Sequence, residues 1–476
     1  MLTYSFENLG NTPLYEHLYK CIKEDILAGK LKAGEKLPSK RAFAVNLNIS
    51  TITIETAYGQ LMAEGYIQSK PKSGYFVAQI DRELLPTGTT TGSGTVGNYK
   101  IAAASAANPN PRWLADFTSN EISQYAFPFQ IWGRIMKSLI QNESQKLVER
   151  TSGTGAAELK DAIAAHLQSF RNMKVTCDQI VIGAGAEYLY GMIIRLLGQD
   201  KIICLENPGY SKIRNIYKSN GVKCVLAGME DSGIRLEDLR KTDADIVHIS
   251  PSHHFPTGNI MSISKRYELL GWANEKEGRF IIEDDYDSEL RFTGKPIPPL
   301  WNMDTSGRVI YLNTFSKTLS PTIRISYMVL SEELTRLYRE KLSFLSCTVS
   351  NFEQYTLAKF ISEGYFEKHL NRMRTFYRKR RNAIIGEFED SSLKNRIKII
   401  EESSGLHFLI SIKTEKSDQQ IKSELASRKI NIQSLGEFYD LESGPQNENI
   451  HTFIINYSSI TDDEIKLAIK GLEEVI

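Results

Sequence analysis

The chain has 476 residues, of which 41% are hydrophobic and 24% charged, with a formal net charge of +1. This composition indicates a folded protein with two or three domains and excludes an intrinsically disordered chain. A net charge near zero neither supports nor excludes a nucleic-acid partner, because a small basic module can be part of a balanced whole.

The cysteines and the apolar segments bear on the cellular compartment. Five scattered cysteines without a C-x-x-C pair are typical of reduced thiols in a cytoplasmic protein. No signal-peptide pattern opens the sequence, and no run of ~18 apolar residues is available to span a bilayer. We therefore expect a cytoplasmic protein that has no membrane partner.

The first predicted elements are two helices. Apolar residues recur at i, i+4 between Leu14 and Ile26, and Thr12 and Pro13 suit the N-cap and first positions of this helix. A second helix is expected to start at Ser39, after the turn sequence "GEKLP".

A third helix and a hairpin follow. Ser50 is a good N-cap, one apolar stripe runs from Ile54 to Leu61, and Gly65 ends the helix. The segment "YIQSKPKSGYFVA" (66–78) predicts two short strands around a basic turn.

These elements fit a DNA-binding module. Two helices joined by a short turn, the second with small polar side chains, match a recognition helix that enters the major groove. The turn "KPKSG" fits a wing in which Lys70 and Lys72 meet phosphates. Any small helical domain shows the same periodicities, so the exposed polar residues are equally consistent with a solvated surface.

A change of composition divides the chain. The stretch "PTGTTTGSGTVGN" (86–98) is rich in Gly and Thr and has no apolar periodicity, which is typical of a flexible linker. We predict a DNA-binding head at 1–79, a linker at 80–112 and a larger body at 113–476.

The body alternates short apolar runs with helix-length segments. Examples of the runs are "QIVIGAG" (179–185), "KIICLE" (201–206), "DIVHIS" (245–250), "RFIIEDD" (279–285) and "RVIYLN" (308–313). Continuous Val, Ile and Leu strands in such alternation predict an α/β fold with a buried, mostly parallel sheet.

One lysine, Lys317, stands among hydroxyl and apolar residues in "LNTFSKTLSPTIRIS" (312–326). A buried ammonium group is costly, and a Schiff base with an aldehyde removes that cost. Pyridoxal 5′-phosphate (PLP) is the usual aldehyde. Read alone, a lysine in a loop that follows a strand is usually a surface lysine.

The sequence offers the further parts that a PLP site needs. Each part has a candidate: Asp284 for the pyridine nitrogen, Tyr286 for the phenolate, Tyr210 to stack on the ring, and Gly185, Ala186, Thr314, Ser316 and Arg324 for the phosphate. Singly, these parts have ordinary readings, since "EDDYDSE" also fits a solvated acidic turn or a metal site. Because all follow successive strands in order, we favour PLP and expect no metal.

The head resembles the winged helix-turn-helix of the GntR family along "LPSKRAFAVNLNISTITIETAYGQLMAEGYI" and "SGYFV". The resemblance implies binding to double-stranded promoter DNA. The expected DNA contacts are Ser39, Lys40, Arg41, Ser50, Thr51, Thr53, Lys72 and Gly74. Thr51 stands where the family often has arginine, so a bidentate guanine contact is not expected there.

From residue 113 onward the body resembles a fold-type I aminotransferase. With the head, the whole chain resembles the MocR/GabR subfamily of bacterial regulators, through "PSHHFPTG", "IIEDDYDSE", "TFSKTL" and "IRISYMVL". This resemblance implies a PLP cofactor, a Schiff base between Lys317 and the aldehyde of PLP, and a head-to-tail homodimer.

Three departures from that subfamily concern the ligand. Members that respond to GABA use two arginines for its carboxylate, and the corresponding effector positions here are Lys212 and Ser459. Ala186 and Glu187 replace a common Thr-Gln pair in the phosphate loop, and Thr322 replaces a glycine before Arg324.

We therefore expect a transcriptional regulator that uses its aminotransferase-like domain for sensing. Without the arginine pair, PLP itself is favoured as the signal, as in PdxR-type members that control vitamin B6 synthesis. The alternatives are an amino acid, a D-alanyl peptide or another amine as effector. A working aminotransferase is disfavoured, because its carboxylate clamp is missing.

Overall fold

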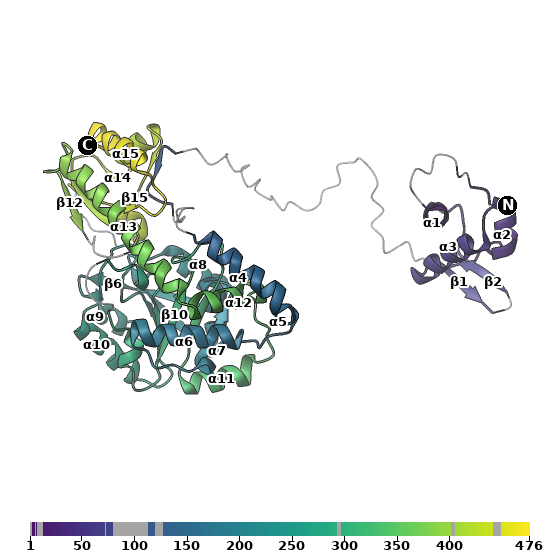
Figure 1. The fold of residues 1–476 in the computed structure, drawn as a ribbon, viewed down its shortest axis with the longest axis horizontal. Helices are drawn as coiled ribbons and strands as arrows, with labels where there is room; N and C mark the ends of the chain where they lie inside the picture. The colour runs from purple at the N-terminus through teal and green to yellow at the C-terminus, as the bar shows by residue number, and fades with distance from the viewer. Residues whose placement is uncertain are drawn as a thin grey trace. The chain divides into compact units, whose positions relative to one another are not determined.

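The computed structural model describes residues 2–4, 6, 13–71, 73–79, 113–119, 127–292, 297–400, 405–440 and 449–476. The chain separates into two units, Met1–Ala106 and Ala107–Ile476 (Figure 1). The predicted linker at 80–112 lies outside the described residues, as do Thr12 and Lys72. In the described part of the chain, no helix is long and apolar enough to cross a membrane.

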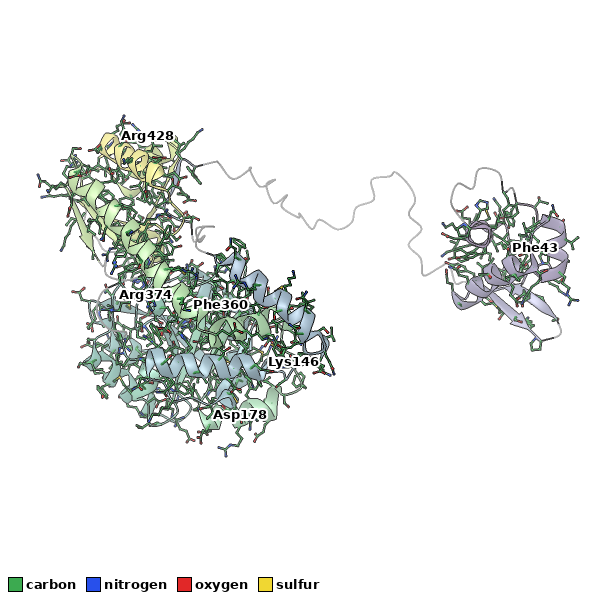
Figure 2. All side chains as sticks on the ribbon, viewed as in Figure 1. Phe43, Lys146, Asp178, Phe360, Arg374 and Arg428 are labelled. Atoms are coloured by element: carbon green, nitrogen blue, oxygen red, sulfur yellow. The ribbon has the colours of Figure 1, made fainter. Side chains whose placement is uncertain are left out.

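The first unit contains the three helices and the hairpin that the sequence predicts. Its elements are α1 (Leu14–Leu27), α2 (Lys40–Leu47), α3 (Thr51–Ala63), β1 (Ile67–Lys70) and β2 (Gly74–Val77). Asn48 between α2 and α3 has a positive φ of 52°, which turns the chain sharply. Phe43, labelled in Figure 2, and Tyr58 are fully buried in a small core between the helices.

An eight-stranded sheet forms the centre of the second unit. Its strands lie in the order β4 (Ile180–Gly183), β11 (Ser326–Val329), β10 (Val309–Thr314), β9 (Phe280–Asp284), β8 (Ile246–Ile249), β5 (Ile202–Asn207), β6 (Lys223–Glu230) and β7 (Gly233–Ile234). The neighbours from β10 to β6 are parallel, whereas β11 is antiparallel to both of its neighbours. The α/β fold with a mostly parallel sheet is thus confirmed.

Both faces of this sheet are buried, which explains its continuous apolar strands. On β10, Tyr311 packs into one core while Ile310 and Leu312 pack into the core of the opposite face. The helices of this part are α4 (Phe129–Asn142), α5 (Ser144–Val148), α6 (Ala157–Arg171), α7 (Ala186–Leu197), α8 (Ser211–Ser219), α9 (Leu236–Arg240), α10 (Ile263–Asn274), α11 (Glu332–Leu342) and α12 (Asn351–Ser362).

A smaller lobe completes the second unit. Its antiparallel sheet has the order β12 (Ile397–Ile400), β13 (His407–Lys413), β16 (Ile450–Asn456) and β15 (Gln433–Ser434), and β14 (Ile430–Asn431) pairs with β3 (Ala115–Asp116). The long helix α13 (Tyr365–Asp390) extends from the large sheet to this lobe, which also holds α14 (Asp418–Ser427) and α15 (Asp462–Val475) (Figure 1).

The sheet topology brings distant segments to one edge. β4, β5, β9 and β10 run in the same direction, because β11 is antiparallel to both β4 and β10. Their carboxyl ends therefore lie at one edge, where α/β sheets bind ligands. Most predicted site residues sit at or just after these strand ends, whereas Arg324 precedes β11, Lys212 lies on α8 and Ser459 follows β16.

Candidate functional site

The helix-turn-helix uses several predicted DNA-contact residues for its own architecture. Ser39 caps α2 by accepting a hydrogen bond from the Ala42 amide at 3.3 Å, and Ser50 caps α3 by accepting one from the Thr53 amide at 3.1 Å. Thr51 and Arg41 are exposed on the two helices.

Charge and backbone conformation place the other head residues. Lys40 forms an ion pair with Glu55 on α3, with 2.6 Å between Nζ and Oε1. Gly74 opens β2 at a φ of 107°, a conformation that favours glycine. Ile52, which the sequence analysis did not select, is 73% exposed on α3. An exposed apolar side chain on such a helix can contact a thymine methyl group. The sequence feature that could have identified Ile52 was its outward position in the 3.6-residue period of the predicted helix.

We expect Arg41→Gln to weaken binding to promoter DNA and to lower the slope of log affinity against log salt by about 1. The exposed guanidinium on α2 would lose one phosphate contact. Fluorescence anisotropy at several salt concentrations, with DNA from upstream of the protein's own gene, measures both effects. Lys30→Gln, in the turn that follows α1, serves as the control, and an unchanged slope for Arg41→Gln would contradict the assignment.

A cavity of about 420 Å³ lies at the carboxyl edge of the large sheet. This volume is within the range of small-molecule pockets. Its lining includes the predicted residues Ala186, Tyr210, Lys212, Asp284, Tyr286, Thr314, Ser316, Lys317 and Arg324. Ser459 is not among the lining residues, so the structure does not bring this predicted effector residue to the cavity.

Lys317 borders the cavity from the loop after β10. This loop is held in place by His369, whose Nε2 lies 2.7 Å from the Thr318 carbonyl oxygen. Burial lowers the pKa of the Lys317 amine, and the negative charge of Asp287 partly opposes that change. A lowered pKa makes the neutral, nucleophilic amine more available near neutral pH.

Asp284 ends β9 and is positioned by two donors that the sequence analysis missed. Tyr190 on α7 donates to Asp284 Oδ2 at 2.5 Å, and His248 Nε2 on β8 lies 3.3 Å from the same oxygen. The Tyr217 hydroxyl is 2.8 Å from His248 Nδ1, so it can donate there and leave the imidazole proton on Nε2. The signal in the sequence was a histidine inside the apolar strand "DIVHIS".

Two tyrosines complete the cavity wall around Asp284 and Lys317. Burial raises the pKa of Tyr286 well above its usual value, so its phenol remains a proton donor. Its hydroxyl lies 3.4 Å from His253 Nδ1. Tyr210 is 41% exposed, and its ring meets Phe255 edge to face at 5.6 Å between centroids.

Arg324 lies against the amino end of α7. Gly185 has a φ of 91°, and a Cβ at this position would overlap Arg324 Nη2. Thr314 and Ser316 line the cavity beside this group, and their hydroxyls are 3.0 Å apart. A guanidinium, two hydroxyls and a helix amino end form a set of groups that suits an anion.

Glu187, the second residue of α7, also faces the cavity. Its carboxylate forms an ion pair with Lys212 of α8, and Arg324 Nη2 lies 3.8 Å from its Oε1. The hydrogen bond from Lys212 lowers the pKa of Glu187, so the side chain is ionised near neutral pH. Lys212, a predicted effector residue, is therefore engaged with a carboxylate of the protein itself.

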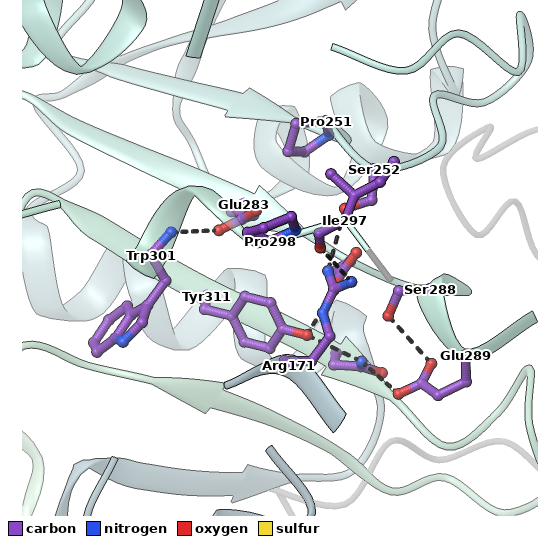
Figure 3. A network of polar contacts seen from close by, with 12 residues as sticks. Arg171, Pro251, Ser252, Glu283, Ser288, Glu289, Ile297, Pro298, Trp301 and Tyr311 are labelled. Carbon is purple, nitrogen blue, oxygen red and sulfur yellow. Dashed lines mark hydrogen bonds and ion pairs between the residues drawn. The ribbon is translucent and has the colours of Figure 1, made fainter. Parts of the chain in front are cut away.

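A network of buried charges surrounds Asp285, the residue that follows Asp284 at the end of β9. Arg171 of α6 is paired with Asp285 and donates to the Ile297 carbonyl at 2.7 Å (Figure 3). Tyr311 donates to Asp285 Oδ2 at 2.7 Å. Glu283 accepts from the Trp301 amide at 2.9 Å, and burial raises its pKa to about 7. In the described ranges, no three His, Cys, Asp or Glu residues are grouped as a metal site.

Two known families match the two units. Residues 14–77 match the bacterial regulatory proteins of the gntR family, and residues 116–471 match aminotransferase class I and II. The chain is 35% identical over 386 residues to the probable rhizopine catabolism regulatory protein MocR of Rhizobium meliloti. The matched region covers 79% of this chain and 77% of MocR.

A second relative and a solved structure extend the match. The chain is 26% identical over 431 residues to the pyridoxine biosynthesis transcriptional regulator PdxR of Corynebacterium glutamicum, covering 90% of this chain and 89% of PdxR. A kynurenine aminotransferase from Pyrococcus horikoshii superposes with a TM-score of 0.66 at 24% identity, over 76% of this chain and 90% of that chain. This last likeness shows the fold alone.

Proposed function

Because the chain belongs to the GntR-family transcriptional regulators of the MocR/GabR type, with an aminotransferase class I and II domain behind the helix-turn-helix, we propose that it senses PLP. The GntR domain makes it a DNA-binding protein, and its aminotransferase domain is of a PLP-dependent family. In this proposal, PLP binds the cavity and its occupancy changes the affinity for promoter DNA.

The observation that carries the proposal is the meeting of Lys317, Asp284, Tyr286 and Arg324 around one cavity. These residues come from the carboxyl end of β9 and from the segment between β10 and β11, and they supply an amine of lowered pKa, a fixed carboxylate, a phenol and a guanidinium. The donor set and the cavity of about 420 Å³ fit a phosphorylated pyridine aldehyde.

The residues can be assigned separate tasks. When bound, PLP supplies an aldehyde and an electron-withdrawing ring. Lys317 would offer the amine for the covalent bond, Asp284 would pair with the ring nitrogen, and Tyr286 would donate to the ring oxygen. Arg324 and the amino end of α7 would hold the phosphate, with help from Thr314 and Ser316. Tyr210 would stack on the ring.

The charges of the cavity favour PLP itself as the signal over an amino acid. Two arginines line the cavity, Arg324 and Arg214, and Arg214 forms an ion pair with Asp440 at 3.1 Å. Lys212 is paired with Glu187, and Ser459 does not line the cavity. An amino-acid carboxylate would therefore have to displace an existing ion pair. The regulator PdxR of pyridoxine biosynthesis, a relative over most of the chain, supports the same effector.

A homodimer is part of the proposal. Helices α4, α5 and α12 pack together and expose the large apolar side chains Phe129, Ile140, Val148 and Phe352. Exposed apolar groups gathered on adjacent helices are typical of an interaction surface. A second copy docked there, in head-to-tail arrangement, would pair two DNA-reading heads and raise their joint affinity.

The test compares DNA binding by PLP-loaded and PLP-stripped protein. We expect the two forms to differ at least about tenfold in affinity or to give different footprints, because a ligand acts through its differential affinity for two states. Gel shifts and footprinting upstream of the protein's own gene measure this difference. Identical affinity and footprint would reject PLP as the signal, and a response to an added amine instead would identify another effector class.

A further inference from the structure

The end of the cavity that suits an anion also contains a carboxylate of the protein, that of Glu187. Glu187 contacts Lys212 and lies 3.8 Å from Arg324, the cation that faces the amino end of α7. We infer that the Glu187 carboxylate competes with the phosphate of PLP for Arg324, and that it thereby weakens phosphate binding and keeps PLP exchangeable. This inference rests on the proposed PLP site and adds a means of setting its affinity.

The Glu187 carboxylate lies close to the place where a phosphate would bind. Glu187 belongs to the first turn of α7, where backbone amides and the helix dipole attract an anion. Arg324 lies against the same turn, at the position that a Cβ of Gly185 would occupy. A phosphate that contacts Arg324 and the amide groups of this turn must therefore come close to the Glu187 carboxylate.

The charges at this end do not balance a phosphate. Two cations, Arg324 and Lys212, face one carboxylate, which leaves a net charge of about +1 against a phosphate that carries about −1.5 to −2. The side chains of all three residues are roughly half exposed, at 47%, 51% and 44%. Water therefore screens the repulsion to a moderate effect, which we set at about tenfold in affinity.

Lys212 limits the competition. Its ion pair with Glu187 holds the carboxylate toward α8 and away from full contact with Arg324. Without Lys212, Glu187 is free to pair with Arg324 completely. Loss of Lys212 is therefore expected to weaken phosphate binding more than loss of a remote surface cation does. When Glu187 is lost as well, part of the phosphate affinity is expected to return.

A sensor must be able to release its ligand. A regulator reports the concentration of free ligand only if its affinity lies near that concentration and the ligand can leave. The covalent bond to Lys317 and the helix amino end both favour retention, and Glu187 opposes them.

The experiment uses full-length wild type, Glu187→Gln, Lys212→Met and the double variant, with PLP and pyridoxal as probes. Pyridoxal has the same aldehyde and ring but no phosphate. Equilibrium titration of the visible absorption of the lysine-linked probe gives each Kd. We expect Glu187→Gln to lower the Kd of PLP about tenfold and to leave that of pyridoxal unchanged. Lys212→Met is expected to raise the Kd of PLP, and the double variant to bind PLP more tightly than Lys212→Met.

Controls separate the possible failures. Glu275→Gln, which removes an exposed carboxylate on the surface pair with Arg240, is expected to leave both Kd values unchanged. Unaltered or weaker PLP binding by Glu187→Gln, or equal tightening for pyridoxal, would overturn the inference while the PLP site stands. Absence of the signal with both probes in the wild type would overturn the proposed function, and this inference with it.

Discussion

Lys317→Ala is expected to abolish the visible absorption of bound PLP and to raise the Kd for PLP by at least about 100-fold. The covalent bond to the lysine is the strongest link in the proposed site, and no other lysine of the described chain lines the cavity except Lys212, which is paired with Glu187. Without that bond, PLP is held by the phosphate and ring contacts alone. Absorption spectra of dialysed protein measure the loss.

The same variant links the cofactor to DNA. If PLP occupancy sets DNA affinity, Lys317→Ala is expected to bind promoter DNA with one affinity whether or not PLP is added. Lys276→Ala removes an exposed surface lysine that pairs with Asp245, and it is expected to behave like the wild type. Retained absorption after dialysis in Lys317→Ala would place the aldehyde on another amine.

The strands that carry the site could be predicted because their chemistry is local. The runs at 179–185, 245–250 and 279–285 contain β4, β8 and β9, and the runs at 201–206 and 308–313 match β5 and β10 except for the last residue of each strand. The strands β6 and β11 were not predicted. Half of "KCVLAGME" is small or polar, and Ala227 alone of this strand is buried, whereas "SYMV" follows the predicted site motif without a turn signal of its own.

The site itself could be predicted only in part. Asp284 and Lys317 stand out as charges next to apolar strands, and their order along the chain matches the strand order at one edge. Their supporting residues lie far away in sequence, since Tyr190 and His248 reach Asp284 across 94 and 36 positions. The histidine inside "DIVHIS" is conspicuous by itself, but nothing local in the sequence joins it or Tyr190 to Asp284, because the pairing of β8 with β9 and the packing of α7 against the sheet create these contacts.

The effector positions show the same limit. Lys212 reaches the cavity, but its ion pair with Glu187 depends on the packing of α7 against α8, which the sequence does not reveal. Ser459 follows β16 in the smaller lobe, and the cavity receives Phe438, Tyr439 and Asp440 from that lobe instead.

Asp285→Asn is expected to lower the free energy of unfolding by about 3–5 kcal/mol, because it removes the charge that pairs directly with the buried Arg171 guanidinium. The side chains of Arg171 and Asp285 are only 2% and 1% exposed. Burial alone would lower the pKa of Arg171, but the charge of Asp285 raises it above the usual value, so the arginine remains charged. Urea titration followed by circular dichroism measures the change.

A matched exposed pair tests whether burial is the cause. Arg339 and Asp178 form an ion pair at 2.9 Å with side chains 59% and 66% exposed, so Asp178→Asn is expected to cost less than about 1 kcal/mol. In the double variant Arg171→Met with Asp285→Asn, both charges are absent, and part of the lost stability is expected to return. A cost for Asp285→Asn no larger than that of Asp178→Asn would show that water reaches Arg171. Because Asp285 directly follows Asp284 at the end of β9, a loosened network would also displace the carboxylate proposed to pair with the ring nitrogen, and PLP affinity should fall together with stability.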